Sequence, residues 1–310
     1  MKLTEILSIV ENKFAVPEGK DYHKIVPELE KNLGSSDTDI RENSLEILWA
    51  WVTKGVLTDK ELIELGNRLV TNLHIGLGEV DTDSVFLRSF STLILAGVIR
   101  TDSNYLEGKI ENRKPFLTRD LLIDWLNRAI EFFIDEKDLR GYIQIKKWAH
   151  AIAHGSDLFK VFSNHPLLER DEHIKILETI AKKLGQPAEH VFSAYEEARI
   201  CSVVATIQTR NLVSLEDYEQ WLQQIIAPFA DVAWYDDKPD PSTFNFRLNA
   251  RVNVRLFLTR LYFMLLFDIQ QISSTNKILY DTISQYSNSL LDLIIQALKK
   301  FSSYNIYAQE

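Results

Sequence analysis

The feature that most constrains the fold is the spacing of apolar residues, which is helical along nearly the whole chain. Apolar side chains recur every three or four residues, as in LTDKELIELGNRLVTNL, where Leu62, Leu65 and Leu69 mark one face. No stretch shows the sustained apolar–polar alternation of a half-buried strand. Glycine and proline, with 11 and 8 residues in 310, fall mostly between the periodic segments. The sequence therefore predicts an all-α protein.

The helical segments are of two kinds that alternate along the chain. Segments of the first kind are amphipathic and have start signals, such as Thr58 followed three residues later by Glu61. Segments of the second kind are apolar around most of their circumference, which is typical of helices contacted on several sides. Each of these begins near an arginine, at intervals of 47, 52, 59 and 56 residues: Arg41, Arg88, Arg140, Arg199 and Arg255. Helix pairs at this spacing predict a HEAT- or armadillo-like α-solenoid of about five degenerate pairs.

The expected organisation is a single α-helical solenoid domain over residues 1–310. Residues 1–35 are expected to form N-terminal capping helices. Residues 230–253 are rich in Pro, Asp and Asn and are predicted to form a long surface loop. Long ordered loops often carry function, so this segment is of interest beyond its connecting role.

Charge and cysteine content exclude several classes of protein. The chain has 35 Lys and Arg against 44 Asp and Glu, a net charge of -9, which argues against a nucleic-acid partner. The single cysteine, Cys201, allows no intrachain disulfide and lies in an apolar run, which favours a core residue over a nucleophile. The most apolar windows are short for a membrane span, and the N-terminus lacks the pattern of a signal peptide. We expect a cytoplasmic protein without a membrane span.

One segment, KKWAHAIAHGSDLF at residues 146–159, combines two histidines and an aspartate at helical spacing. Helix positions i, i+4 and i+7 lie within about 60° of one another, so His150, His154 and Asp157 are predicted to form one polar stripe. The opposite face is predicted to be apolar and to consist of Ile145, Trp148, Ile152 and Phe159.

Three uses of this stripe are open at the level of sequence. Two histidines and a carboxylate are a permitted ligand set for zinc, iron or manganese. No glutamate follows the first histidine, so the metalloprotease pattern is absent. The stripe can also line a polar pocket for a ligand, or its side chains can simply bond neighbouring loops. A divalent metal is thus one candidate cofactor, and no cofactor is certain.

Acidic and arginine side chains gather just before the helices of the second kind. In a solenoid, equivalent positions stack along one edge, so these groups are expected to come close to one another. They are the candidates for ligand binding in a groove: Glu79, Arg88, Glu136, Asp138, Arg140, Trp148 and Glu197. The alternative is structural, because acids cap helix N-termini and an arginine in an apolar helix must find a partner.

Three motifs resemble those of a known family: GLGEVDTDSVFLRSFSTLILAGVI, DEKDLRGYIQIKKWAHAIAHGSDLF and YEEARI. The family is a bacterial one, domain of unknown function 2785, and the resemblance extends over roughly residues 40–210. It has no established activity, so the resemblance implies neither a reaction nor a cofactor. It singles out one set of residues, whose roles stay open: Glu79, Arg88, Arg140, Trp148, His150, His154, Asp157 and Glu197.

Two functional hypotheses follow from these observations. The first is a binding or scaffolding protein that holds a protein or small molecule in the solenoid groove, as solenoids often do. The alternative is a metal-assisted hydrolase, in which the His-x3-His-x2-Asp stripe binds the metal and Glu79 or Glu197 activates a water. The first is favoured because the chain carries no known catalytic signature. A base-modifying enzyme acting on nucleic acid is a third hypothesis, which the net charge disfavours.

Overall fold

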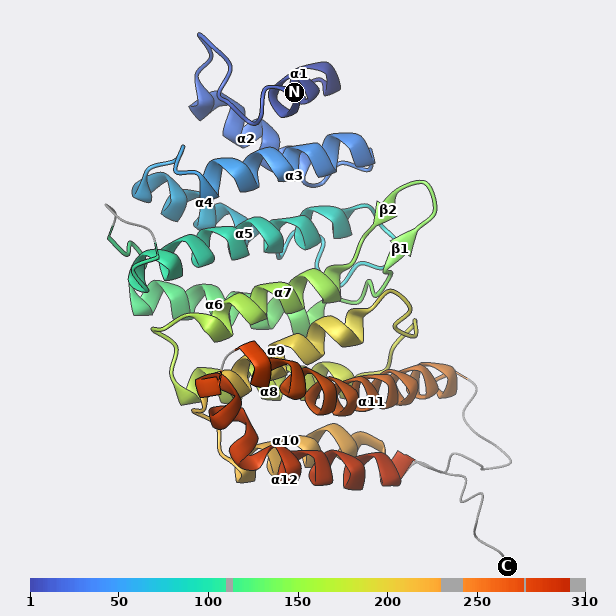
Figure 1. Cartoon of the computed structure of the whole chain (residues 1–310). Coiled ribbons are helices and arrows are strands. Elements are labelled where there is room, and N and C mark those ends of the chain that lie inside the picture. The colour runs from blue at the N-terminus through green and yellow to red at the C-terminus, as the bar shows by residue number, and fades with distance from the viewer. Residues whose placement is uncertain (110–113, 230–241, 276, 302–310) are drawn as a thin grey trace, which may run out of the picture. The chain divides into compact units, whose positions relative to one another are not determined.

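The computed structural model describes residues 1–109, 114–229, 242–275 and 277–301 (Figure 1). Its contacts form two compact units, residues 1–168 and residues 169–310. The first unit contains α1 (Leu3–Glu11), α2 (Tyr22–Asn32), α3 (Thr38–Thr53), α4 (Asp59–Asn72), α5 (Ser84–Leu106), α6 (Arg119–Asp135), β1 (Tyr142–Ile143), β2 (Lys147–Trp148) and α7 (Ala151–Asn164). The second contains α8 (Arg170–Gly185), α9 (Glu196–Arg210), α10 (Leu215–Ile226), the 3-10 turn η1 (Ala227–Phe229), α11 (Phe244–Thr275) and α12 (Lys277–Phe301). The prediction of an all-α protein is confirmed.

In the first unit, α3, α5 and α7 lie side by side, with α5 in the middle (Figure 1). The helices α2, α4 and α6 pack against them as a second layer, and α1 packs on α3. Side chains of α5 are buried along nearly its whole length, as its apolar circumference predicts. Among the described residues, α5 is also the helix long and apolar enough to cross a membrane, but 78% of its apolar window is buried. The apolar character of α5 is therefore that of a core helix.

Helix starts lie where side chains satisfy the free backbone N–H groups. At α4 the predicted capping box is present, with the backbone N–H of Thr58 donating to Glu61 at 2.7 Å. At α10 the backbone N–H of Ser214 donates to Asp217 at 2.9 Å. Asp37 accepts two backbone N–H groups at the start of α3. These caps fix the positions at which α3, α4 and α10 begin.

Two glycines allow helices of the first unit to approach closely. A Cβ placed on Gly66 of α4 would lie 2.1 Å from the ring of Trp125 in α6. A Cβ on Gly155 of α7 would lie 2.9 Å from Phe133, also in α6. The lack of a side chain at these two positions is what lets α6 approach α4 and α7.

In the second unit, α8 packs with α10, α9 packs with α11, and α12 packs on α10 and α11. The indole N–H of Trp221 in α10 donates to the carbonyl of Leu177 in α8 at 2.7 Å. Cys201 in α9 is fully buried, and this burial raises the pKa of its thiol well above the ordinary value. The prediction of a core cysteine is confirmed.

Two predicted elements are wrong in part. Residues 141–149 do not extend α7 toward the N-terminus, because they form the antiparallel hairpin of β1 and β2. Residues 244–253 do not belong to a loop, because α11 begins at Phe244. The remainder of the predicted long loop, residues 230–241, lies outside the described residues. Residues 1–35 contain the helices α1 and α2, and their capping role stays a prediction.

Candidate functional site

The polar stripe of α7 begins one residue before the helix itself. His150 is the N-cap of α7 and has a left-handed backbone, with φ at 52°. Its carbonyl accepts the backbone N–H of His154 at 2.8 Å, so the two histidines keep their one-turn spacing. Their rings meet edge to face, with centroids 5.5 Å apart. Asp157 follows within the helix and is half-buried.

The ring of His154 is oriented by a serine of the neighbouring helix. Ser89 of α5 is fully buried, and its hydroxyl donates to the carbonyl of Ala149. The same hydroxyl oxygen lies 2.8 Å from Nδ1 of His154. A hydroxyl has one proton, so Ser89 must accept at the second contact, and Nδ1 of His154 must donate. In the neutral ring the acceptor nitrogen is therefore Nε2.

The structure gives the predicted metal ligands no metal-binding geometry. Among the residues that it describes, no three or more His, Cys, Asp or Glu side chains form a group able to hold a metal ion. His150, His154 and Asp157 are all within the described part of the chain. The metal stays a prediction that elemental analysis of the purified protein would test.

Directly before His150, the hairpin of β1 and β2 exposes three large apolar side chains. Tyr142, Ile145 and Trp148 are 56%, 90% and 39% exposed. Tyr142 pairs with Trp148 across the two strands, and their rings meet edge to face at 4.9 Å. Trp148 also contacts His150, whose ring stacks on the indole with centroids 4.4 Å apart and an angle of 25° between the ring planes. Trp148 therefore contacts the histidine stripe, whereas the sequence places it on the opposite face; that placement is wrong.

The backbone of this hairpin is strained. Ile145 at its tip has φ at 76°, and Lys147 has φ at 59°. A β-branched residue in the left-handed region is an outlier, and such residues cost about 1–3 kcal/mol each unless the surroundings fix them. Strain of this kind is concentrated at functional sites, so the hairpin is a candidate for one.

A buried arginine holds the hairpin in place. Arg41 of α3 is fully buried and donates to the carbonyl of Lys146 at 2.6 Å and to the carbonyl of Ser35 at 2.7 Å. Its guanidinium lies over the rings of Phe86 and Phe90, at 4.1 and 4.8 Å. Burial lowers the pKa of Arg41 from its ordinary value, while nearby carboxylates oppose that shift. The hairpin conformation is thus fixed by a charged group inside the core.

A second contact joins the hairpin to the start of α5. The ammonium group of Lys146 lies 2.7 Å from the carboxylate of Asp83. The hydroxyl of Thr38 also donates to the Lys146 carbonyl, at 3.0 Å. The tip is therefore attached to the N-terminal ends of both α3 and α5.

Four of the predicted ligand-binding residues bond to one another and to loops. Arg88 and Glu136 are both fully buried and form a two-point ion pair, with distances of 2.6 and 2.9 Å. Arg88 also donates to the carbonyl of Gly76 at 2.7 Å. Arg140 contacts Asp138 at 2.5 Å, and this hydrogen bond raises the pKa of Arg140. These contacts are what the structural alternative predicts, and a ligand role for the four stays a prediction.

Glu79 lies nearby, in the loop between α4 and α5. Its carboxylate accepts hydrogen bonds from Ser84 at 2.7 Å and from Thr82 at 2.8 Å. These bonds lower the pKa of Glu79. Because Ser84 also accepts from Arg88, Glu79 completes the hydrogen-bond network that holds this loop.

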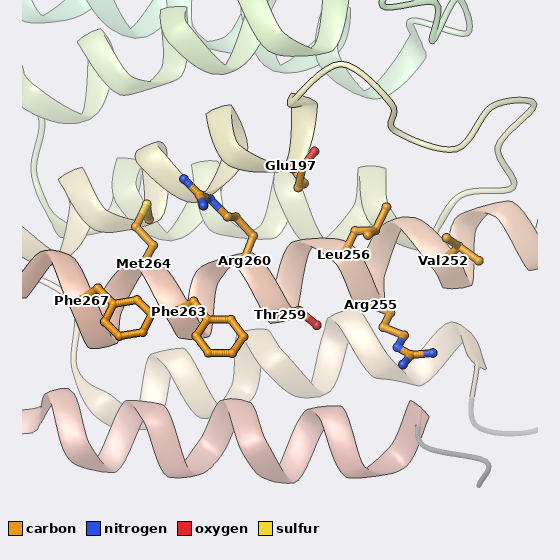
Figure 2. Close-up of a pocket in the computed structure, with 9 residues that line it drawn as sticks. All are labelled: Glu197, Val252, Arg255, Leu256, Thr259, Arg260, Phe263, Met264 and Phe267. Atoms are coloured by element: carbon orange, nitrogen blue, oxygen red, sulfur yellow. The ribbon is translucent and has the colours of Figure 1, made fainter.

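Glu197 belongs to the second unit, where it lines an open groove of about 690 Å³ between α9 and α11 (Figure 2). Burial raises its pKa, the charge of Glu196 adds to the rise, and Arg260 opposes it. Arg255, Arg260, Phe263 and Phe267 of α11 line the same groove. The groove therefore brings Glu197 together with arginines of α11. The two histidines belong to the first unit.

A comparison with family models places most of these residues within one family. The model described as "Protein of unknown function (DUF2785)" matches residues 73–263, which is more than half of the chain. The chain belongs to the DUF2785 family. No curated protein and no solved structure matches it.

The DUF2785 match extends further toward the C-terminus than the motifs in the sequence indicate. It includes the hairpin, both histidines and Glu197, and it ends at Phe263 within α11. It begins after Arg41, so the anchor of the hairpin lies outside the matched region. The family match supplies no reaction, and any function rests on the geometry.

Sequence reasoning missed the hairpin and the role of Arg41. One signal was present, because YIQI at residues 142–145 is rich in residues that favour strands. Nothing in the sequence pairs Arg41 with a carbonyl at residue 146.

Proposed function

We propose that this DUF2785 protein is a binding protein that contacts a protein partner with the hairpin at residues 142–148. The observation that carries the proposal is the exposure of Tyr142, Ile145 and Trp148 on a hairpin whose backbone is strained and held from the core. Exposed aromatic and aliphatic side chains at one place are typical of protein contact sites.

The fixed conformation of the hairpin favours binding. A hairpin held by Arg41 and Asp83 loses little conformational entropy on binding, since its ordering is complete before the partner arrives. The stacked pair of Trp148 and His150 adds a flat surface beside the tip. An aromatic anchor next to a protruding aliphatic tip suits insertion into a pocket of the partner.

The ion pairs and hydrogen bonds of the polar side chains near the hairpin also favour binding over catalysis. Arg88 and Glu136 pair inside the core, and Arg140 pairs with Asp138. Nδ1 of His154 donates to Ser89, which orients the ring against α5. These side chains make structural contacts with other parts of the first unit, and no specific observation favours the metal-assisted alternative.

Photocrosslinking tests the proposal. A photoreactive phenylalanine analogue replaces Tyr142, which is exposed and aromatic, and the full chain is irradiated in cells of its source organism. We expect one discrete crosslinked protein, identified by mass spectrometry. The same analogue at Ile75, which is 48% exposed in the same unit, is the matched control and should give no such product.

The variant Ile145→Gly separates binding from stability. Glycine accepts a φ of 76° without strain, so the free energy of unfolding should change by less than about 1 kcal/mol. The crosslinked product at position 142 should nevertheless be lost, because the tip side chain is gone. A product that persists in Ile145→Gly, or that forms equally at position 75, contradicts the proposal.

A further inference from the structure

Helix α11 has apolar side chains on two faces, and one of these faces is partly exposed in the groove beside α9. Its inner face is buried against the second unit, as at Phe257 and Leu261. Its outer face carries Leu256, Phe263 and Phe267, which are 38%, 46% and 53% exposed. Residues on the outer face follow the spacing i, i+4, i+7, i+11 and i+15 from Val252, so they form one continuous stripe along the helix.

The two phenylalanines at one end of this stripe form a ready contact surface. The rings of Phe263 and Phe267 lie parallel, with an angle of 9° and centroids 5.8 Å apart. Figure 2 shows both rings on the same side of α11. An exposed apolar stripe of this length on a helix is unusual for a surface that only meets water.

The same part of α11 is strongly basic. Residues 244–267 contain four arginines and no acidic residue, in a chain whose net charge is -9: Arg247, Arg251, Arg255 and Arg260. Arg255 and Arg260 line the groove and are exposed. Within the described residues, neither forms a hydrogen bond or an ion pair, although the charge of Arg260 acts on Glu197 across the groove, so both guanidinium groups can still pair with an anionic partner.

We propose that the groove between α9 and α11 binds an acidic amphipathic helix of a partner protein. The stripe from Val252 to Phe267 is about 22 Å long at 1.5 Å per residue, which matches four turns of a bound helix. Apolar side chains of that helix would pack on Phe263 and Phe267, and its carboxylates would pair with Arg255 and Arg260. The site lies in the second unit and is independent of the hairpin proposal.

The groove favours a helix over an anionic membrane surface. It is concave, with a volume of about 690 Å³, whereas a membrane presents a broad and nearly flat surface. Glu197 stands on the α9 wall opposite α11, where it would face the phosphate groups of a membrane (Figure 2). A bound helix can instead place a neutral or basic residue beside Glu197.

The experiment uses a designed peptide and the full chain. The peptide is a fluorescent helix of roughly 18 residues, with leucines at i, i+3, i+4 and i+7 and glutamates on its flanks. Fluorescence anisotropy should show saturable binding that weakens as salt is raised. The double variants Arg255→Ala/Arg260→Ala and Phe263→Ser/Phe267→Ser should each weaken binding by about tenfold or more.

Controls separate this site from general attraction. Arg100→Ala removes an exposed arginine of α5 and should leave the affinity unchanged. A peptide with lysine in place of every glutamate should not bind. Circular dichroism confirms folding of the variants, which is expected to persist because the replaced side chains are exposed.

Three outcomes overturn the proposal. The first is unchanged affinity in both double variants, and the second is equal binding of the lysine peptide. The third is that phosphatidylserine vesicles bind the chain while the acidic peptide does not, with both variants abolishing vesicle binding. That result would assign the stripe to a membrane surface.

Discussion

At the scale of single residues, the buried arginines of the first unit explain how its loops are held. Arg41 and Arg88 are fully buried, and each donates to backbone carbonyls outside its own helix: Arg41 to Lys146 in the hairpin, and Arg88 to Gly76 in the loop before α5. A buried guanidinium without partners would be strongly destabilising, so each loop conformation is coupled to the burial of its arginine. The sequence located both arginines by their spacing. It did not reveal their partners, because a carbonyl acceptor carries no side-chain signal.

The ion pair of Arg88 and Glu136 allows a direct test at this scale. Replacing Glu136 by leucine leaves Arg88 with a buried and uncompensated charge, so the free energy of unfolding should fall by about 3–5 kcal/mol. The matched control is Glu64→Leu, which breaks the exposed pair with Lys60 and should cost less than about 1 kcal/mol. Urea unfolding followed by circular dichroism measures both values. Similar losses in the two variants would show that the buried pair has no special role.

At the scale of elements, helix ends were predictable where a side chain marks them. The start of α4 at the Thr58–Glu61 box agrees with the sequence. Residues 141–149 were not predictable in this way, since their apolar residues fit helical spacing while tertiary bonds to Lys146 select a hairpin. Residues 244–253 follow Pro241 and contain neither glycine nor proline, so nothing in the segment itself prevents a helix. Residues 230–253 as a whole are rich in Pro, Asp and Asn, so the sequence predicts a loop for all of them.

The contact between α4 and α6 gives a prediction about helix packing. In Gly66→Ala the new methyl would lie 2.1 Å from the buried ring of Trp125, whose Nε1 bonds Asn67 at 2.9 Å and resists movement. Overpacking costs about 1–3 kcal/mol, and the helix preference of alanine returns up to about 1 kcal/mol. We expect a net loss of about 1–2 kcal/mol in the free energy of unfolding.

Gly97→Ala is the comparison for this variant. Its methyl would lie 3.1 Å from Trp49, which is half-buried and has room to shift, so stability should change by less than about 1 kcal/mol. Chemical unfolding monitored by tryptophan fluorescence provides both values. If Gly97→Ala were the more damaging substitution, close packing of Trp125 on α4 would not limit stability.

At the scale of the whole molecule, the predicted solenoid agrees with the layering of the first unit and stays a prediction for the chain. The alternation of α3, α5 and α7 with α2, α4 and α6 is what stacked helix pairs produce.

Net charge is another property of the whole chain, and here the net charge of the chain and the charge of one segment differ in sign. The chain carries -9, whereas residues 244–267 of α11 carry four arginines and no acid.

This difference decides what kind of anion the chain can hold. Duplex DNA is a long polyanion that extends beyond one site, so it meets the surrounding negative charge of the chain, which is screened only over about 10 Å at 0.1 M salt. A short acidic helix meets only the charges within that distance, where Arg255 and Arg260 dominate. We therefore expect no retardation of a DNA duplex in a gel at about 10 μM protein and about 50 mM salt. Retardation that disappears in Arg255→Ala/Arg260→Ala would show instead that the local stripe outweighs the net charge, and that nucleic acid is a ligand of α11.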